Sequence, residues 1–408
     1  MEHRVYDPAK DKKAAHRIWA EVGWLEQGPE EATDCLIEAG RALVADIRGE
    51  AECMVTTMPG VFRYLAEDLP FCAVTSVATS HIARRQGLAA RLLARIIAED
   101  AADGALMAGL GMFDQGFYNR LGFGTGAYEH WVAFDPATLD VATEARVPYR
   151  LTLDDWEKVH ASRLARKRRH GACSLFSPAA TRAEMLWTSN SFGLGYYDGS
   201  NGELTHHLWG ASRGENGPYG VWWLSYRTGA QFLELMALLK GISDQVRMVR
   251  MNEPPGIQLQ DLLKKPFRLR QITRKSEFEN VMRSTAYWQV RICDLEKCLE
   301  RTHLRGEALR FNLKLHDPLE RYLDEGAPWR GVGGDYVATL GSDSGAERGV
   351  DHALPTLDVS VGAFTRLWLG VRPATSLAVT DHLSGPQELL EALDWALCLP
   401  EPHLDWDF

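Results

Sequence analysis

The sequence predicts a mixed α/β (α+β) protein built from three successive segments. Its 408 residues exceed what one hydrophobic core usually serves, so two or three domains are expected. Apolar residues make up 45% and charged residues 25% of the chain, which is typical of folded globular proteins. Strand-like alternation and helix-like periodicity follow one another along the chain, and this favours strands and helices packed in layers.

The first segment, residues 1–134, carries the clearest pattern. Alternation of apolar residues marks its strands, and an apolar stripe at helical spacing marks its helices. The predicted elements are a strand at 4–6, a helix at 9–22, strands at 41–47, 51–58 and 71–79, a helix at 88–100, a strand at 105–112, a helix at 115–121 and a last strand ending near 133.

The second segment, residues 135–284, starts at a turn-rich join. Its predicted elements are a strand at 220–227, a helix at 231–239 and a strand at 245–251. Their order resembles that of the first segment, which is consistent with a degenerate duplication.

The third segment, residues 285–408, opens with a strand that feeds a helix. Further strands are predicted at 335–340, 357–361 and 377–380. The closing helix, 386–398, has Pro386 at its first position and an apolar stripe at helical spacing.

The overall charge of the chain limits its partners. The net charge is -10 and the pI is about 5.8, which argues against a nucleic-acid partner. An acidic protein attracts cationic small molecules by its field alone. The one basic run, residues 163–170, is short and lacks interleaved aromatic residues, so a solvated helix face is expected there.

The apolar runs and the cysteines of the chain indicate its location. We expect a cytoplasmic protein without membrane contact, since no apolar run is long enough to span a bilayer and the N-terminus lacks the apolar core of a signal peptide. Seven cysteines are scattered without metal-ligand spacing, so neither a disulfide framework nor a metal site is expected.

The most informative block is residues 71–97, where an apolar strand runs into a turn and then directly into a helix. The turn holds Arg84, Arg85, Gln86 and Gly87. The unpaired N–H groups of a helix N-terminus form an anion site, and Gly87 permits close approach of the backbone to a ligand. The pattern lacks the residues of a Walker loop or a dinucleotide fingerprint. It indicates a pyrophosphate cradle, against the alternative of an ordinary polar turn.

Two motifs in this segment resemble those of the GNAT (GCN5-related N-acetyltransferase) superfamily. Arg84-x-x-Gly87-x-Ala89 after a strand matches its coenzyme A signature, and 117–124 (FYNRLGFG) resembles its FYxxxGF hallmark. The resemblance implies a GNAT fold and acetyl-CoA as co-substrate.

The whole chain resembles the Eis (enhanced intracellular survival) proteins. This resemblance implies three domains: GNAT at 1–134, a degenerate GNAT-like domain at 135–284 and a sterol carrier protein-like domain at 285–408. It also implies a homo-oligomer, commonly a hexamer, and acetylation of amines such as aminoglycosides and polyamines.

The resemblance assigns the proton transfers to two residues. An acceptor amine must lose a proton before its nitrogen attacks the thioester, and the departing thiolate benefits from a proton donor. Tyr118 matches the general acid of the family. The C-terminal carboxylate of Phe408 matches its general base, provided that the chain end is held in place. No metal is needed.

The resemblance also implies which residues hold acetyl-CoA. The last strand residues before the turn would act through their backbone groups, and one of their N–H groups would polarise the thioester carbonyl. The residues that hold acetyl-CoA are Val77, Ala78, Thr79, Arg84, Arg85, Gln86, Gly87, Leu88, Ala89, Ala90, Phe113 and Asp114. Asp114 equally suits a helix N-cap.

For the acceptor the sequence offers fewer residues. Asp407 stands where the family keeps an acidic residue, which suits a cationic amine. Trp24 and Glu26, with Glu30 and Glu31, are candidates for the wall of the site, although each fits an ordinary surface or packing role. Trp222, Trp223 and Tyr226 are expected in the core of the second segment.

We therefore expect direct acetyl transfer in a ternary complex. No cysteine lies in the two motifs, so a covalent acetyl-enzyme has no evident nucleophile. Two alternatives remain: a non-catalytic acyl-CoA-binding sensor, and a lipid or hydrophobe carrier acting through the third segment.

Overall fold

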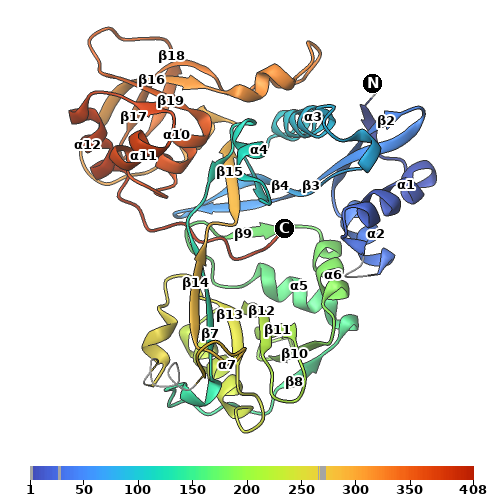
Figure 1. Ribbon diagram of the computed structural model, residues 1–408. Coiled ribbons are helices and arrows are strands. Elements are labelled where there is room, and N and C mark those ends of the chain that lie inside the picture. Colours follow the sequence, from blue (N-terminus) through green and yellow to red (C-terminus); the bar gives the residue numbers. More distant parts are fainter. Residues whose placement is uncertain (1–2, 26–28, 265, 267–272) are drawn as a thin grey trace.

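The computed structural model describes residues 3–25, 29–264, 266 and 273–408, and these residues form three sheets (Figure 1). The mixed α/β class is confirmed. Figure 1 shows the C-terminal sheet beside the first sheet and the central sheet beneath it. In the described part of the chain, no helix has the length and apolarity needed to cross a membrane.

The first sheet has the order β1-β2-β3-β4-β5-β15-β6, with β9 on the edge of β3. Helix α3 packs its apolar face on this sheet, and Leu92, Leu93, Ile96 and Ile97 of the predicted stripe are buried. Helix α2 was not predicted. The strands are β1 (His3–Val5), β2 (Arg41–Ile47), β3 (Glu50–Tyr64), β4 (Glu67–Thr79), β5 (Met107–Gly111), β6 (Gly124–Thr125), β9 (Cys173–Leu175) and β15 (Trp288–Ile292). The helices are α1 (Pro8–Glu21), α2 (Glu30–Glu38), α3 (Leu88–Ala102) and α4 (Gln115–Asn119).

The second sheet has the order β14-β7-β13-β12-β11-β10-β8. Its run β8-β10-β11-β12-β13 repeats the run β1-β2-β3-β4-β5, because in both only the last pair is parallel. This repeat agrees with the predicted duplication. The strands are β7 (Glu129–Phe134), β8 (Tyr149–Leu151), β10 (Ser191–Tyr196), β11 (His206–Ala211), β12 (Tyr219–Ser225), β13 (Val249–Asn252) and β14 (Val281–Thr285). The helices are α5 (Trp156–Leu164), α6 (Pro178–Trp187) and α7 (Gly229–Gly241).

A two-stranded ribbon joins the first two sheets. The antiparallel register Val281↔Ala133 continues unchanged to Val290↔Gly124, so β6 and β7 pair with β15 and β14 as one ladder. The ribbon places β7 in the second sheet and β15 in the first. The predicted boundaries at 134 and 284 lie at this ribbon, and the domain division stays a prediction.

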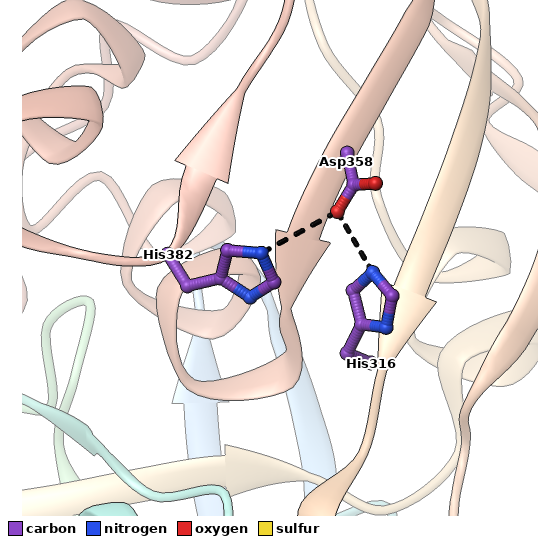
Figure 2. A group of neighbouring side chains, drawn as sticks. All are labelled: His316, Asp358 and His382. Carbon is purple, nitrogen blue, oxygen red and sulfur yellow. Dashed lines mark hydrogen bonds and ion pairs between the residues drawn. The ribbon is translucent and has the colours of Figure 1, made fainter.

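The third sheet has the order β18-β17-β16-β19-β20. Its solvent-facing side carries His316, Asp358 and His382 (Figure 2). The predicted apolar stripe of the closing helix is buried at Leu389, Leu390 and Leu393. The strands are β16 (Leu309–His316), β17 (Gly334–Leu340), β18 (Gly345–Arg348), β19 (Thr356–Ser360) and β20 (Leu383–Ser384), and the helices are α9 (Leu295–Glu300), α10 (Val361–Trp368), α11 (Ala374–Thr380) and α12 (Gln387–Ala396).

The prediction of a strand at 377–380 was wrong, because these residues lie in α11. Pro373 precedes the helix as its N-cap residue, and the Asp394 carboxylate accepts a hydrogen bond from the Thr375 N–H. That acceptor lies on the next helix, α12, so a local pattern does not reveal it. The sterol carrier likeness of this domain is not confirmed and stays a prediction.

The third sheet docks on the first through a buried ion pair. Arg291 of β15 is fully buried, pairs with Asp317 and donates to the Leu121 carbonyl. The glycines of the second motif permit the approach, since a Cβ on Gly124 would lie 2.2 Å from the Gly362 carbonyl oxygen of α10.

Another buried carboxyl lies on the shared ribbon. Glu129, the first residue of β7, is 5% exposed. Burial raises its pKa to about 8, and the charge of Asp407 adds to the rise.

We expect Asp317→Ala to lower the free energy of unfolding by about 3–5 kcal/mol, because it leaves the Arg291 guanidinium buried and unpaired. Denaturant unfolding of the purified chain measures the change. The control is Asp324→Ala, whose exposed carboxylate should contribute within about 0.5 kcal/mol. Equal effects of the two substitutions would show that the ion pair does not fix the domain contact.

We expect Glu129→Gln to change how stability depends on pH. The folded chain keeps the Glu129 proton to about pH 8, whereas an exposed glutamate loses it near 4.5. Stability of the wild type therefore falls as pH rises between these values, by up to the order of 3–5 kcal/mol. The variant should lack this fall, and so exceed the wild type most above pH 8. Denaturant unfolding from pH 4.5 to 9 tests it, with exposed Glu144→Gln as control; parallel curves would contradict the assignment.

Candidate active site

A cleft opens where β4 and β5 separate. The two strands pair in parallel only as far as Val74↔Leu110. At the next residue, Thr75, β4 carries an extra residue relative to β3, because Ser76 pairs with Thr56 while Val74 pairs with Thr57. Such β-bulges bend a strand and are frequent beside active sites. The resulting cleft has a volume of about 1150 Å³.

The turn predicted to hold phosphates forms one end of this cleft. Gly87 is the N-cap of α3 and adopts φ = 74°, a left-handed conformation that favours glycine. No side chain caps the helix at this residue. The first N–H groups of α3 are therefore available to an anion, and Arg84 and Arg85 add positive charge along the same cleft.

Most of the predicted cofactor residues line this one cleft. Ala78 does not, since its side chain is buried in the core, and Gln86 donates its side-chain amide to the Ile82 carbonyl instead. The residues that do line it are Val77, Thr79, Arg84, Arg85, Gly87, Leu88, Ala89, Ala90, Phe113 and Asp114.

Tyr118 of α4, the helix that follows β5, also lines the cleft. Asp114 is the N-cap of α4 and accepts a hydrogen bond from the Phe117 N–H, so the N-cap alternative for this residue is confirmed. The Tyr118 ring contacts the rings of Phe113, Phe117 and Phe123 edge to face. Burial, with a smaller contribution from the Asp114 charge, raises the pKa of Tyr118 well above its usual range. The phenol therefore stays protonated at neutral pH.

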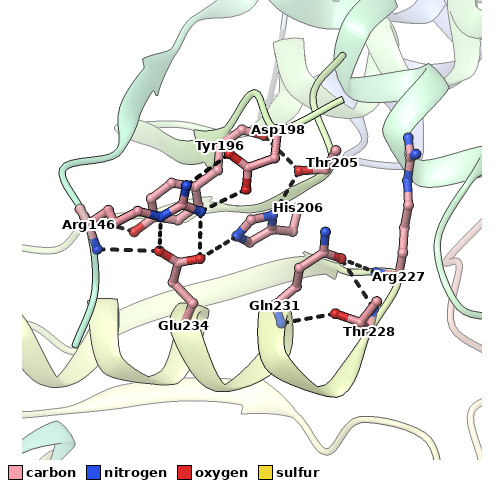
Figure 3. A network of polar contacts seen from close by, with 9 residues as sticks. All are labelled: Arg146, Tyr196, Asp198, Thr205, His206, Arg227, Thr228, Gln231 and Glu234. Carbon is pink, nitrogen blue, oxygen red and sulfur yellow. Dashed lines mark hydrogen bonds and ion pairs between the residues drawn. The ribbon is translucent and has the colours of Figure 1, made fainter. Parts of the chain in front are cut away.

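The equivalent helix of the second domain has a closed N-terminus (Figure 3). Thr228 accepts a hydrogen bond from the Gln231 N–H, and the Gln231 side chain accepts from the N–H groups of Arg227 and Thr228. This capping box occupies three of the N–H groups at this end of the helix, which an anion would otherwise bind. The second domain therefore lacks the phosphate site of the first.

The second domain also has the same bulge and the same separation of strands. β12 pairs with β13 only as far as Val221↔Met251, and Trp222 is the extra residue at its bulge. Residues 403–407 lie against this cleft, and only about 70 Å³ remains open. The cleft that stays open in the first domain is filled in the second by the end of the chain.

An ion pair and a stacked arginine hold the C-terminal tail. The Asp405 carboxylate pairs with Arg166 and accepts a hydrogen bond from the Cys173 N–H. Arg163 lies between two indole rings, 3.6 Å from the Trp406 centroid and 3.9 Å from that of Trp223.

Two expectations about this region were wrong. The basic run was expected on a solvated helix face, but Arg163 and Arg166 are 3% and 9% exposed because they bind the tail. Trp222 was expected in the core, but it is 43% exposed and lines the second cleft. Leu404 and Trp406 are buried, although the tail forms no strand.

A second cavity, of about 330 Å³, adjoins the cofactor cleft. Its walls are largely aromatic and apolar, and they include Trp19 and Trp187. Trp24, Thr75 and Phe408 line both the cavity and the cleft, so the two spaces meet at these residues.

The last residue lies at this junction. The Phe408 ring packs against Phe71 with centroids 5.6 Å apart, and a Cβ on Gly111 would lie 3.2 Å from a backbone carboxylate oxygen of Phe408. Of the predicted acceptor residues, Trp24 and Asp407 line the cavity. Glu26 lies outside the described residues.

Sequence reasoning missed Glu184 of α6, which lines the same cavity. Its carboxylate pairs with Arg163 at 2.8 Å and accepts a hydrogen bond from the Trp406 indole N–H at 3.0 Å. Burial raises the pKa of Glu184 and of Asp407. No signal around Glu184 marked it, since its partners come from α5 and from the tail. Glu30 and Glu31 instead pair with His16 and Arg182 on the surface of α2.

Comparisons with known proteins agree with this architecture. Three solved structures are similar to this chain, and each match covers 100% of both chains. They are a probable N-acyltransferase from Enterococcus faecalis (18% identity, TM-score 0.77), a GCN5-related N-acetyltransferase from Anabaena variabilis (14%, 0.76) and Eis1 from Mycobacterium abscessus (17%, 0.75). At these identities the likeness establishes the fold.

The family comparison concerns the first domain alone. No curated protein matches the chain in sequence. Residues 8–126 match the family described as acetyltransferase (GNAT) domain, and they contain both motifs and the open cleft. Enzymes with this domain use acetyl-CoA as co-substrate. The chain thus carries a GNAT acetyltransferase domain, and it is an N-acetyltransferase of the GNAT type.

Proposed function

We propose that the chain transfers the acetyl group of acetyl-CoA directly to the amine of a cationic acceptor, within a ternary complex. The observation that carries this proposal is the junction of the two cavities at Trp24, Thr75 and Phe408. A cofactor in the larger cleft and an acceptor in the smaller cavity would meet there, beside the C-terminal carboxylate.

The cleft suits the two chemically distinct parts of acetyl-CoA. Its pyrophosphate would bind the uncapped N–H groups of α3, with Arg84 and Arg85 beside it. Its pantetheine arm would run between the separated strands, where the β4 residues Val77, Ala78 and Thr79 offer backbone groups.

Tyr118 would act as the general acid. The amine nitrogen attacks the thioester carbonyl carbon, the C–S bond breaks, and the sulfur leaves with the electron pair. A free thiol has a pKa of about 8.5, and burial in the cleft would raise it, as burial raises the pKa of the Tyr118 phenol. The phenol stays protonated and is therefore available as a donor to the departing thiolate.

The Phe408 carboxylate would accept the proton that the amine loses. Its reference pKa, about 3.3–3.7, is low for a base. Glu184 and Asp407 line the same cavity, and both burial and neighbouring negative charge favour the protonated form of a carboxyl. The raised pKa of Asp407 is consistent with that environment.

The acceptor cavity suits a cationic amine. Glu184, Asp407 and the chain end supply negative charge, and the faces of Trp19, Trp24 and Trp187 suit a cation or an apolar body. Aminoglycosides, polyamines and lysine-like amines are the candidates that the family resemblance supplies. Eis1 is a fold neighbour only, so the acceptor is decided by assay.

Two alternatives differ in what they require. A sensor would bind acyl-CoA without depending on Tyr118, and a lipid carrier would bind apolar ligands in the third domain. The homo-hexamer and the cytoplasmic location stay predictions.

We expect Gly87→Ala to weaken acetyl-CoA binding by about 10-fold, because an alanine at this positive φ is strained by about 1–2 kcal/mol and would shift the phosphate turn. Gly104→Ala is the matched control, since Gly104 also has a positive φ, follows the same helix and lies outside the cleft. Calorimetric titration of both variants measures the affinity. A loss of affinity common to both would reflect the fold instead of the turn.

We expect Tyr118→Phe, and separately one residue appended after Phe408, each to lower kcat by about 10²–10⁴, the range of general acid–base catalysis. Coenzyme A release across a panel of amines gives the rates, and calorimetry should show unchanged acetyl-CoA affinity. The control is Tyr128→Phe, an exposed tyrosine outside the cleft. If acetyl-CoA binds and no amine in the panel is acetylated, direct transfer to a cationic amine is wrong and the sensor is favoured.

A further inference from the structure

Three side chains with metal-binding atoms converge on the third domain, far from the cleft in sequence and unused by the proposed reaction. His316 ends β16, Asp358 lies in β19 and His382 directly precedes β20 (Figure 2). Their side chains are 42%, 30% and 61% exposed, so an ion can reach them from solvent.

The three donor atoms lie close enough to share one ion. His316 Nε2 is 2.7 Å and His382 Nε2 is 3.6 Å from the same oxygen, Asp358 Oδ1. The two imidazole centroids are 5.1 Å apart. All three donor atoms lie within 4.8 Å of one another, and small side-chain rotations would bring each to the distance of about 2.0–2.2 Å that zinc requires.

The backbone beneath the cluster is fixed by the sheet. Ser360 of β19 pairs with His316 of β16 and donates its N–H to the His382 carbonyl oxygen at 2.9 Å. On the opposite face of the same strands, Leu315 and Val359 are buried in the core. The three ligands therefore project from two adjacent strands and from the residue directly before a third, and the sheet sets their spacing before any ion binds.

One charged neighbour limits the affinity. The Lys314 ammonium lies 2.9 Å from Asp358 Oδ2, the carboxylate oxygen that the histidines do not share. An aspartate carboxylate is ionised at neutral pH, so Oδ1 is a competent ligand. Lys314 orients the carboxylate but repels a cation, and we expect a site of moderate strength.

Among the described residues, a second group of side chains with metal-binding atoms, Asp198, His206 and Glu234, already binds an arginine. Arg146 binds the carboxylates of both Asp198 and Glu234, and His206 contacts the same Glu234 (Figure 3). Hydrogen bonds from Arg146 lower the pKa of Glu234 to about 2. A cation there would have to displace a guanidinium, so the cluster on the third sheet is the better candidate.

We propose that His316, Asp358 and His382 bind one divalent transition-metal ion of the zinc class, with water at the remaining position. Two imidazole nitrogens and one carboxylate oxygen are a ligand set that zinc and its neighbours accept, with tetrahedral geometry completed by solvent. The ion would cross-link β16, β19 and the segment before β20. The site does not depend on the proposed acetyl transfer.

The test is titration of the untagged full-length chain with Zn²⁺ by calorimetry at pH 7.5. We expect one ion per chain, lost on adding a chelator, with affinity lowered at least about 10-fold by His316→Ala and by His382→Ala. His352→Ala, an exposed histidine of the same domain, is the matched control and should bind as the wild type does.

Two further measurements separate a metal site from adsorption. Co²⁺ should give the visible absorption of a four-coordinate centre, and both histidine variants should abolish it. Lys314→Met should tighten Zn²⁺ binding, because it removes a positive charge beside the ion. Wild-type Zn²⁺ binding in both histidine variants, or no saturable binding to the wild-type chain, would overturn the proposal.

Discussion

The site depends on how Arg163 and Arg166 hold the end of the chain. Chain ends usually fray, and a carboxylate that frays cannot occupy a fixed place in a reaction. Arg166 fixes Asp405, and Arg163 lies between the indoles of Trp406 and Trp223 while pairing with Glu184. Because these contacts secure the residues directly before Phe408, this residue lies at the junction of the two cavities, where its carboxylate is proposed to act.

The duplicated fold gives the two halves different tasks. Both have a bulge followed by separated strands, at Thr75 in the first domain and at Trp222 in the second. In the first the cleft is open and α3 begins at an uncapped Gly87, whereas in the second a capping box closes α7 and the tail occupies the cleft. The second domain thus positions the tail that, in the proposed function, completes the site of the first.

Local patterns predicted the features that a short stretch of chain determines. The Arg84–Gly87 turn and the α3 stripe were predicted because their residues are neighbours in sequence. Sequence patterns did not predict that β7 lies in the second sheet and β15 in the first, nor did they predict the partners of Arg163. These contacts join residues that are distant in sequence. The wrong prediction of a strand at 377–380 has the same origin, since the Thr375 N–H donates to the distant Asp394 carboxylate.

Charge balance connects the acceptor cavity to the class of molecule that would enter it. Glu184, Asp407 and the Phe408 carboxylate line one space of about 330 Å³, and Arg163, paired with Glu184, neutralises one of the three. Concentrating the remaining negative charge away from bulk water is unfavourable, and the raised pKa of Asp407 reflects this. In the proposed reaction an entering ammonium would offset part of this excess, and the later transfer of its proton to a carboxylate would leave the net charge of the cavity unchanged. The imbalance thus supports the proposed binding of a cationic amine, and it makes a carboxylate of this cavity a stronger base than its reference pKa implies.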